Sequence, residues 1–267
     1  MRKRMVRVRR RPPAKRMAAL FALTLAAFLY MTLRRGDPVE AILSARDAER
    51  VRTDVVFEGI ELHAVRTAAC NSQETARVEA ARYAPRGAAG YVLRRETWHV
   101  LCAGYETAGD AAAVRDRLRE EEGMACDTVS LVCGSVRLRV TATVEQTAAL
   151  VACEKKLRET VALIGALSYS LDGGDTAVPQ LLGVLRSQRE ALSAARVRFL
   201  ETAGGGEGLD DAVCRPLIDI AEAAEKGLDT LTGEASSLSQ TLFSGRMKAL
   251  FLALRVRQIE YLASLGG

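Results

Sequence analysis

The sequence predicts an α+β protein in which a short antiparallel sheet precedes a bundle of helices, with a membrane-spanning helix ahead of both. Three observations predict this class. Between residues 57 and 135, extended apolar stretches alternate with alanine-rich helical stretches. Beyond residue 144, leucines recur at helical spacings of three, four and seven residues. Near the N-terminus, residues 17–33 form an uncharged apolar run.

The N-terminal segment has the composition of a membrane anchor. Residues 1–16 carry nine Lys and Arg and no acidic residue, and residues 17–33 read MAALFALTLAAFLYMTL. At about 1.5 Å per residue this run is close to the shortest that crosses a bilayer, and the flanking arginines can extend its reach. A cleaved signal peptide is the alternative, but no small-x-small cleavage site follows. The positive charge predicts a cytoplasmic N-terminus in a bacterial cell membrane, with residues from about 36 onward outside the cytoplasm.

The charge and composition of the remaining residues disfavour several functions. The whole chain has a formal net charge of +5, but beyond residue 16 there are 29 basic and 33 acidic residues. This remainder lacks an excess of positive charge for phosphate, so we expect no nucleic-acid binding. The sequence has only two histidines and shows neither a glycine-rich phosphate loop nor a paired-carboxylate motif. We therefore expect a protein that is not an enzyme and needs no cofactor.

The cysteines fit no metal pattern. There is no CxxC motif, and the two histidines are far apart, so we expect no metal site. Outside the cytoplasm disulfides are possible, and their pairing stays open. Cys153 and Cys214 lie in helical runs, where we expect small buried apolar residues. The six cysteines are Cys70, Cys102, Cys126, Cys133, Cys153 and Cys214.

Residues 61–92 and 97–128 form an internal repeat with an offset of 36 positions. His63 falls on His99, so the two histidines of the chain occupy the same place in each copy. Repetition therefore explains their matched surroundings better than a catalytic pair. The other matches are Ala76 with Ala112, Val78 with Val114, Gly87 with Gly123, and Ala89 with Ala125.

Each copy has the helix-start and helix-end residues expected of a strand–helix–strand unit. Asn71 and Thr107 are candidate N-caps, and each is followed three residues later by an acidic residue. Gly87 and Gly123 suit the position just after a helix. Extended stretches stand before and after each helix. The pair predicts a duplicated βαβ, β-α-β-β-α-β, with a four-stranded antiparallel sheet and two helices on one face.

The second copy, WHVLCAGYETAGDAAAVRDRLREEEGMACDTVSLV, resembles a SPOR (sporulation-related) domain of bacterial envelope proteins. The resemblance covers roughly residues 57–135. It implies a protein that binds peptidoglycan glycan strands, in cell division or sporulation, through the open face of the sheet. The positions that fit the family pattern are Trp98, Val100, Cys102, Tyr105, Ala111, Leu118 and Gly123.

The candidate binding residues follow from this topology and from side-chain alternation. The first and third strands are expected to be central neighbours, with His63 and His99 side by side on the open face. His99 and Cys102 then point to opposite faces, which excludes them as a base and nucleophile. The candidate peptidoglycan-binding residues are His63, Val65, Arg94, Arg95, His99 and Leu101.

The C-terminal half predicts a bundle of three or four antiparallel helices after a connecting strand at 135–143. Glycine-rich breaks at 172–175 and 204–208 separate the helical runs. Most of each leucine stripe is expected to pack inside the bundle, with a seam left for a protein partner.

The sequence thus leaves two functions open. The first is a non-enzymatic, single-pass envelope protein that binds glycan strands. The second is an adaptor whose SPOR-like module and bundle make protein contacts without glycan binding, because Val65 and Leu101 stand where the family often has a polar residue. RNA binding through the sheet is disfavoured, because the sequence lacks the paired aromatic residues on central strands and the positive charge that such binding uses. The expected division is a basic cytoplasmic tail at 1–16, a transmembrane helix at 17–33, a linker at 34–54, the SPOR-like domain at 55–135, and the connector strand and helical bundle at 136–267.

Overall fold

The computed structural model describes residues 49–203 and 210–266. The predicted membrane-spanning run at 17–33 lies outside these residues, as do the basic tail and most of the linker. Within the described ranges, no helix is both long and apolar enough to cross a membrane. From Arg50 onward the chain forms one compact unit of mixed α and β structure, which confirms the predicted α+β class.

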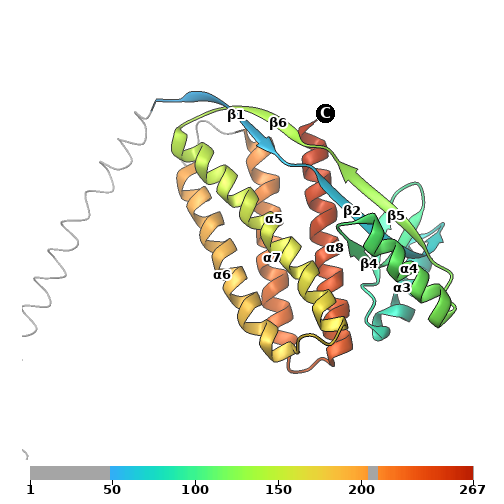
Figure 1. The fold of residues 1–267 in the computed structure, drawn as a ribbon. Helices are drawn as coiled ribbons and strands as arrows, with labels where there is room; N and C mark the ends of the chain where they lie inside the picture. Colours follow the sequence, from blue (N-terminus) through green and yellow to red (C-terminus); the bar gives the residue numbers. More distant parts are fainter. Residues whose placement is uncertain (1–48, 204–209, 267) are drawn as a thin grey trace, which may run out of the picture. The chain divides into compact units, whose positions relative to one another are not determined.

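A four-stranded antiparallel sheet forms the first part of this unit (Figure 1). Its strand order is β3-β4-β2-β5, so β2 and β4 are the adjacent central strands, as the sequence predicts. A 3₁₀ turn, η1 (Ala84–Arg86), links the first helix to the edge strand. In chain order the elements are β2 (Ile60–Cys70), α3 (Gln73–Tyr83), β3 (Tyr91–Arg94), β4 (Trp98–Tyr105), α4 (Ala108–Glu122) and β5 (Asp127–Cys133).

Two further strands form a separate two-stranded sheet that continues the line of β2 and β5 as a long ribbon. β1 (Val51–Phe57) pairs antiparallel with β6 (Val136–Ala142). Phe57 lies opposite Val136, and Ile60 on β2 lies opposite Cys133 on β5, so the register continues unchanged across the break between the two strand pairs. The predicted connector strand therefore belongs to a second, two-stranded sheet that prolongs the β2–β5 pair. Figure 1 shows this ribbon passing over one end of the helices.

The helix termini of the sheet region follow the predicted capping chemistry, with one shift. Thr107 caps α4, because its hydroxyl accepts a hydrogen bond from the Asp110 amide at 3.1 Å. The cap of α3 is Ser72 and not Asn71, since the Ser72 hydroxyl accepts from the Thr75 amide at 3.1 Å. Gly123 ends α4 with φ 62°, a left-handed conformation that glycine adopts without a Cβ clash.

Four long helices form an antiparallel bundle, as the leucine spacing predicts. They are α5 (Val144–Asp172), α6 (Val178–Ala203), α7 (Asp211–Glu234) and α8 (Gln240–Leu265). The predicted heptad positions are buried, because each stripe packs on the neighbouring helices. These positions are Leu150, Leu157, Ile164, Leu171, Leu185, Leu192 and Phe199.

The sheet lies between two helical layers. α3 and α4 cover one face, and α8 covers the other, where Leu62 and Leu101 join the core of the bundle. Gly104 marks the closest approach: a Cβ there would lie 2.8 Å from Leu62 Cδ1 and would overlap the Leu252 side chain of α8. Figure 1 shows α8 as the bundle helix next to the sheet. The segments predicted as separate domains, 55–135 and 136–267, therefore share one hydrophobic core.

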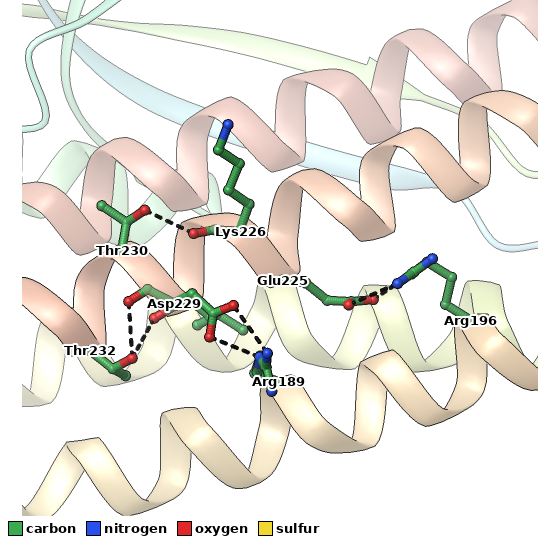
Figure 2. Close-up of polar contacts among 8 residues, drawn as sticks. Arg189, Arg196, Glu225, Lys226, Asp229, Thr230 and Thr232 are labelled. Carbon is green, nitrogen blue, oxygen red and sulfur yellow. Dashed lines mark hydrogen bonds and ion pairs between the residues drawn. The ribbon is translucent and has the colours of Figure 1, made fainter.

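Ion pairs join α6 to α7 on the side of the bundle away from the sheet (Figure 2). Arg196 Nε donates to Glu225 at 2.6 Å, and the side chains of this pair are 17% and 11% exposed. One helical repeat earlier, Arg189 Nε lies 2.8 Å from Asp229, but these side chains are 39% and 54% exposed. The two contacts fix the antiparallel register of α6 and α7. The Arg196–Glu225 contact is buried, and the Arg189–Asp229 contact is exposed to solvent.

The burial difference predicts unequal effects for the same substitution. Removing the cation in Arg196→Met leaves the Glu225 carboxylate buried without its partner, and we expect a loss of about 3–5 kcal/mol of unfolding free energy. Arg189→Met breaks a solvated pair, and we expect a loss of about 0–1 kcal/mol. Urea unfolding of both variants measures the difference. Equal losses would contradict the assigned burial of the first pair.

Candidate functional site

The predicted open face of the sheet is not open, and this changes the setting of the candidate residues. Leu101 and Val65 are fully buried, Leu101 in the core shared with the bundle and Val65 in the cluster under α4. Neither can contact a ligand in this structure. The expectation that they lie on an exposed binding face is wrong, because α8 fills one side and α4 covers the other.

Leu101 lies on the face away from α3 and α4, as alternation predicts, and only Val65 lies on the other face. The central strand pair is also irregular. The register of β2 against β4 shifts between Val65 and Arg66 and again between Arg66 and Ala68. A bulge changes which face the following residues occupy. As a result Ala64 on β2 faces the bundle, while Ala68 and Cys70 join the cluster under α3.

The two histidines do not lie side by side. His63 pairs with Tyr105 and His99 pairs with Ala69, because the strands that carry them run antiparallel. They are separated by six residues along the ladder, or about 20 Å. His63 is buried, with Nδ1 2.8 Å from the Ser130 hydroxyl and Nε2 3.2 Å from a Glu61 carboxylate oxygen. Its hydrogen bonds are thus satisfied within the sheet.

The two arginines of the candidate site lie at the turn between β3 and β4. Arg94 is exposed, and its guanidinium stacks 4.8 Å above the ring of Trp98, the only tryptophan. Arg95 is also exposed, and its charge acts on His99. Both remain accessible to a ligand, but neither lies near His63.

A polar cluster around His99 is the site that the structure does assemble. Arg66, on the central strand β2, makes a two-pronged contact with Asp127 at the start of β5, with Nε donating to Oδ1 at 2.8 Å. Its Nη1 also lies 3.3 Å from His99 Nε2, which contacts the Thr97 hydroxyl at 3.1 Å. The cluster therefore joins three strands at one end of the sheet.

The electrostatics of the cluster follow from the Arg66–Asp127 pair. The Arg66 guanidinium hydrogen-bonds Asp127 and holds the pKa of that carboxyl below its usual value. Burial, and then the charges of Arg66 and Arg95, lower the pKa of His99. His99 is thus neutral at pH 7, and Nε2 accepts from Arg66, which assigns the proton to Nδ1. This Nδ1 is buried and has no hydrogen-bond partner among the described residues.

Sequence reasoning missed Arg66 and Asp127. The available signal was a charged residue within the apolar strand LHAVRTAAC, since a charge on a central strand needs a partner close by. The partner itself depends on the β2–β5 register, in which Arg66 lies opposite Asp127.

The thiols carry no sign of catalytic activation. Cys102 belongs to the cluster under α4, on the face opposite His99, which agrees with the exclusion of that pair. Burial raises the pKa of Cys102 to about 12 and that of Cys153 also to about 12. All six cysteines are free, and Cys153 and Cys214 are buried as expected. Across residues 49–203 and 210–266 there is no group of three or more His, Cys, Asp or Glu that could hold a metal ion.

Comparison with known proteins adds no assignment: no protein family, curated protein or solved structure matches this chain.

The His99 environment predicts a specific response to pH. We expect NMR titration to give a His99 midpoint below 6.5, and Arg66→Met to raise it, because the variant removes a nearby positive charge and leaves Asp127. Since the unfolded state then binds the proton more readily, His99 contributes a loss of folding stability as the pH falls below about 6.5. Arg94→Gln is the control and leaves the midpoint unchanged. A midpoint that Arg66→Met lowers would rule out this arrangement.

Thiol burial predicts a graded alkylation pattern. With iodoacetamide at pH 8 under native conditions, half-buried Cys133 is labelled first, and Cys102 and Cys153 are protected because their thiols are buried and protonated. Mass spectrometry of the peptides measures each site, and denatured protein labelled at all six provides the reference. Rapid labelling of Cys102 would reopen the question of a nucleophile.

Proposed function

We propose that this chain is a non-enzymatic, single-pass bacterial envelope protein that acts as an adaptor through protein contacts. The observation that carries the proposal is the position of α8 across the sheet face that a SPOR-like module would offer to glycan strands. With Leu101 buried beneath it, that face has no free surface at its centre. The geometry thus favours the second of the two functions that the sequence leaves open.

The cover formed by α8 is part of the folded core. Phe251 and Leu252 are buried, and the Arg255 guanidinium contacts Glu106 at the loop between β4 and α4. Gln258 accepts a further hydrogen bond from Arg255 at 3.3 Å. Because α8 also packs on α5 and α7, its removal from the sheet would expose core on both sides. This argues against a cover that opens to admit a polymer.

The outer surfaces of the bundle are the proposed contact region. α5 exposes Val144 and Val151, and α6 exposes Val197 and Leu200. Exposed apolar residues of this kind suit protein recognition better than glycan recognition. In this proposal residues 17–33 anchor the protein in the membrane, with the adaptor outside the cytoplasm. The SPOR-like module is interpreted as a duplicated βαβ unit whose sheet serves as a scaffold.

Glycan binding remains the second candidate, and the His99 cluster is the observation in its favour. Arg66, Asp127 and Thr97 are partly exposed polar side chains at the end of the sheet, and Arg95 lies nearby. A short glycan segment could contact this end without reaching the face under α8. Cell division and sporulation are the settings that this alternative implies.

Co-sedimentation with purified peptidoglycan sacculi separates the two functions. We expect residues 49–267 to stay in the supernatant, at the level of a protein with no wall affinity, because the central sheet face is filled. Retention in the pellet that His99→Ala and Arg66→Gln abolish, and that the exposed control Arg82→Gln preserves, would contradict the adaptor proposal and favour glycan binding at the cluster.

A further inference from the structure

A cleft beside α4 is separate from the His99 cluster. It lies between η1 and α4, and the end of α5 and the start of α8 close it on one side. Its volume is about 500 Å³, within the range of small-molecule sites. Its lining comes from six elements of the compact unit, α3, η1, β4, α4, α5 and α8, and from the loops beside them.

The cleft exists because the two helices on one face of the sheet pack on separate clusters. Ala76 and Ala80 of α3 pack with Val100, whereas Ala111 of α4 packs with Val65. On the α4 side, the floor of the cleft is formed by short side chains of that helix's cluster. These are Ala88, Cys102 and Ala103. Val114, Leu118 and Met124 add an apolar wall.

Tyr105 supplies a fixed hydrogen-bonding group in this cleft. The residue is only 6% exposed, and its ring stacks on Tyr169 with centroids 4.8 Å apart. Burial raises the pKa of its hydroxyl, which therefore stays protonated at neutral pH. The hydroxyl forms no hydrogen bond among the described residues and is not one of their buried unpartnered polar atoms, so it stays accessible to solvent in the cleft.

The closed end of the cleft is polar, and its one positive and one negative side chain already form an ion pair. Buried Lys248 on α8 donates to Asp172 at 2.5 Å and to the Gly87 carbonyl at 2.9 Å. The Ser244 hydroxyl bonds the other oxygen of Asp172. This network ties α8 to the end of α5 and to the loop after η1, so it holds the cleft open and contributes no net charge.

The rim carries both signs of charge without internal pairing. Arg86 and Arg117 line the cleft together with Glu121 and Glu122. None of these four side chains forms an ion pair or hydrogen bond within the described part of the chain. Two free cations and two free carboxylates around an apolar floor complement a ligand that carries one charge of each sign.

We propose that this cleft binds a zwitterionic small molecule with an apolar body, of the amino-acid or uncapped-dipeptide class. The ligand carboxylate contacts Arg86 and Arg117, its ammonium contacts Glu121 and Glu122, and its amide or carboxyl oxygen accepts from Tyr105. The site is independent of the proposed adaptor function, because it uses neither the bundle surface nor the His99 cluster.

Calorimetric titration of the full-length chain in detergent with the dipeptide L-alanyl-L-leucine tests the proposal. We expect saturable binding, lost for the N-acetylated, C-amidated form of the same dipeptide. Tyr105→Phe keeps the ring stack and removes only the hydroxyl, so affinity is expected to fall about 3- to 10-fold. Arg86→Gln combined with Arg117→Gln should weaken binding further.

Arg82→Gln is the matched control, because Arg82 is an exposed arginine at the end of α3 that does not line the cleft. It should bind like the parent chain. Absence of binding by the parent, equal binding of the capped dipeptide, or unchanged affinity in Tyr105→Phe would each overturn the proposal. Circular dichroism of each variant confirms that a lost signal does not come from unfolding.

Discussion

The packing of α8 against the sheet is the contact on which the rest of the described structure depends. At Gly104 the strand has no side chain, and Leu252 of α8 occupies the space that a Cβ would need. Gly165 on α5 serves the same helix, because a Cβ there would lie 2.9 Å from Phe251. Two glycines on different elements thus admit two large α8 side chains. The sheet and the bundle share one core as a result.

This shared core accounts for both functional proposals. Helices cover both faces of the sheet, so little of the sheet surface is free. The surfaces available for recognition therefore lie at the margins of the module. Those margins are the His99 cluster at the strand ends, the cleft beside α4 and the outer helices of the bundle. Each is positioned by the same packed layers. The cleft, in particular, depends on α8 through the contact of Lys248 with Asp172 and Gly87.

Much of the fold could be predicted from local patterns. The strand order and the α4 cap follow from spacing and turn chemistry, and the bundle follows from the leucine stripes. The position of α8 could not be predicted in this way, because MKALFLALRVRQIEYLASL contains polar residues that an amphipathic helix would turn to solvent. The structure buries three of them, Lys248, Arg255 and Gln258, between the sheet and the bundle.

The candidate site could not be predicted in the same way. Assigning His63, Val65, His99 and Leu101 to one face requires β2 and β4 to be equivalent copies, and the register shifts around Arg66 show that they are not. Such shifts depend on packing between strands that are distant in sequence. The Arg66–Asp127 pair likewise depends on a register across 61 residues. All four residues do lie on strands, as expected, but their neighbours come from tertiary structure.

The central claim is that α8 makes the sheet and bundle one cooperative unit, and urea unfolding of residues 49–267 tests it most directly. Trp98 is the only tryptophan and reports on the sheet, whereas circular dichroism at 222 nm reports mainly on α5 to α8, which hold most of the helical residues described. The account predicts a single transition with the same midpoint by both probes. Two separate midpoints, with the tryptophan signal changing while the helices stay folded, would contradict it.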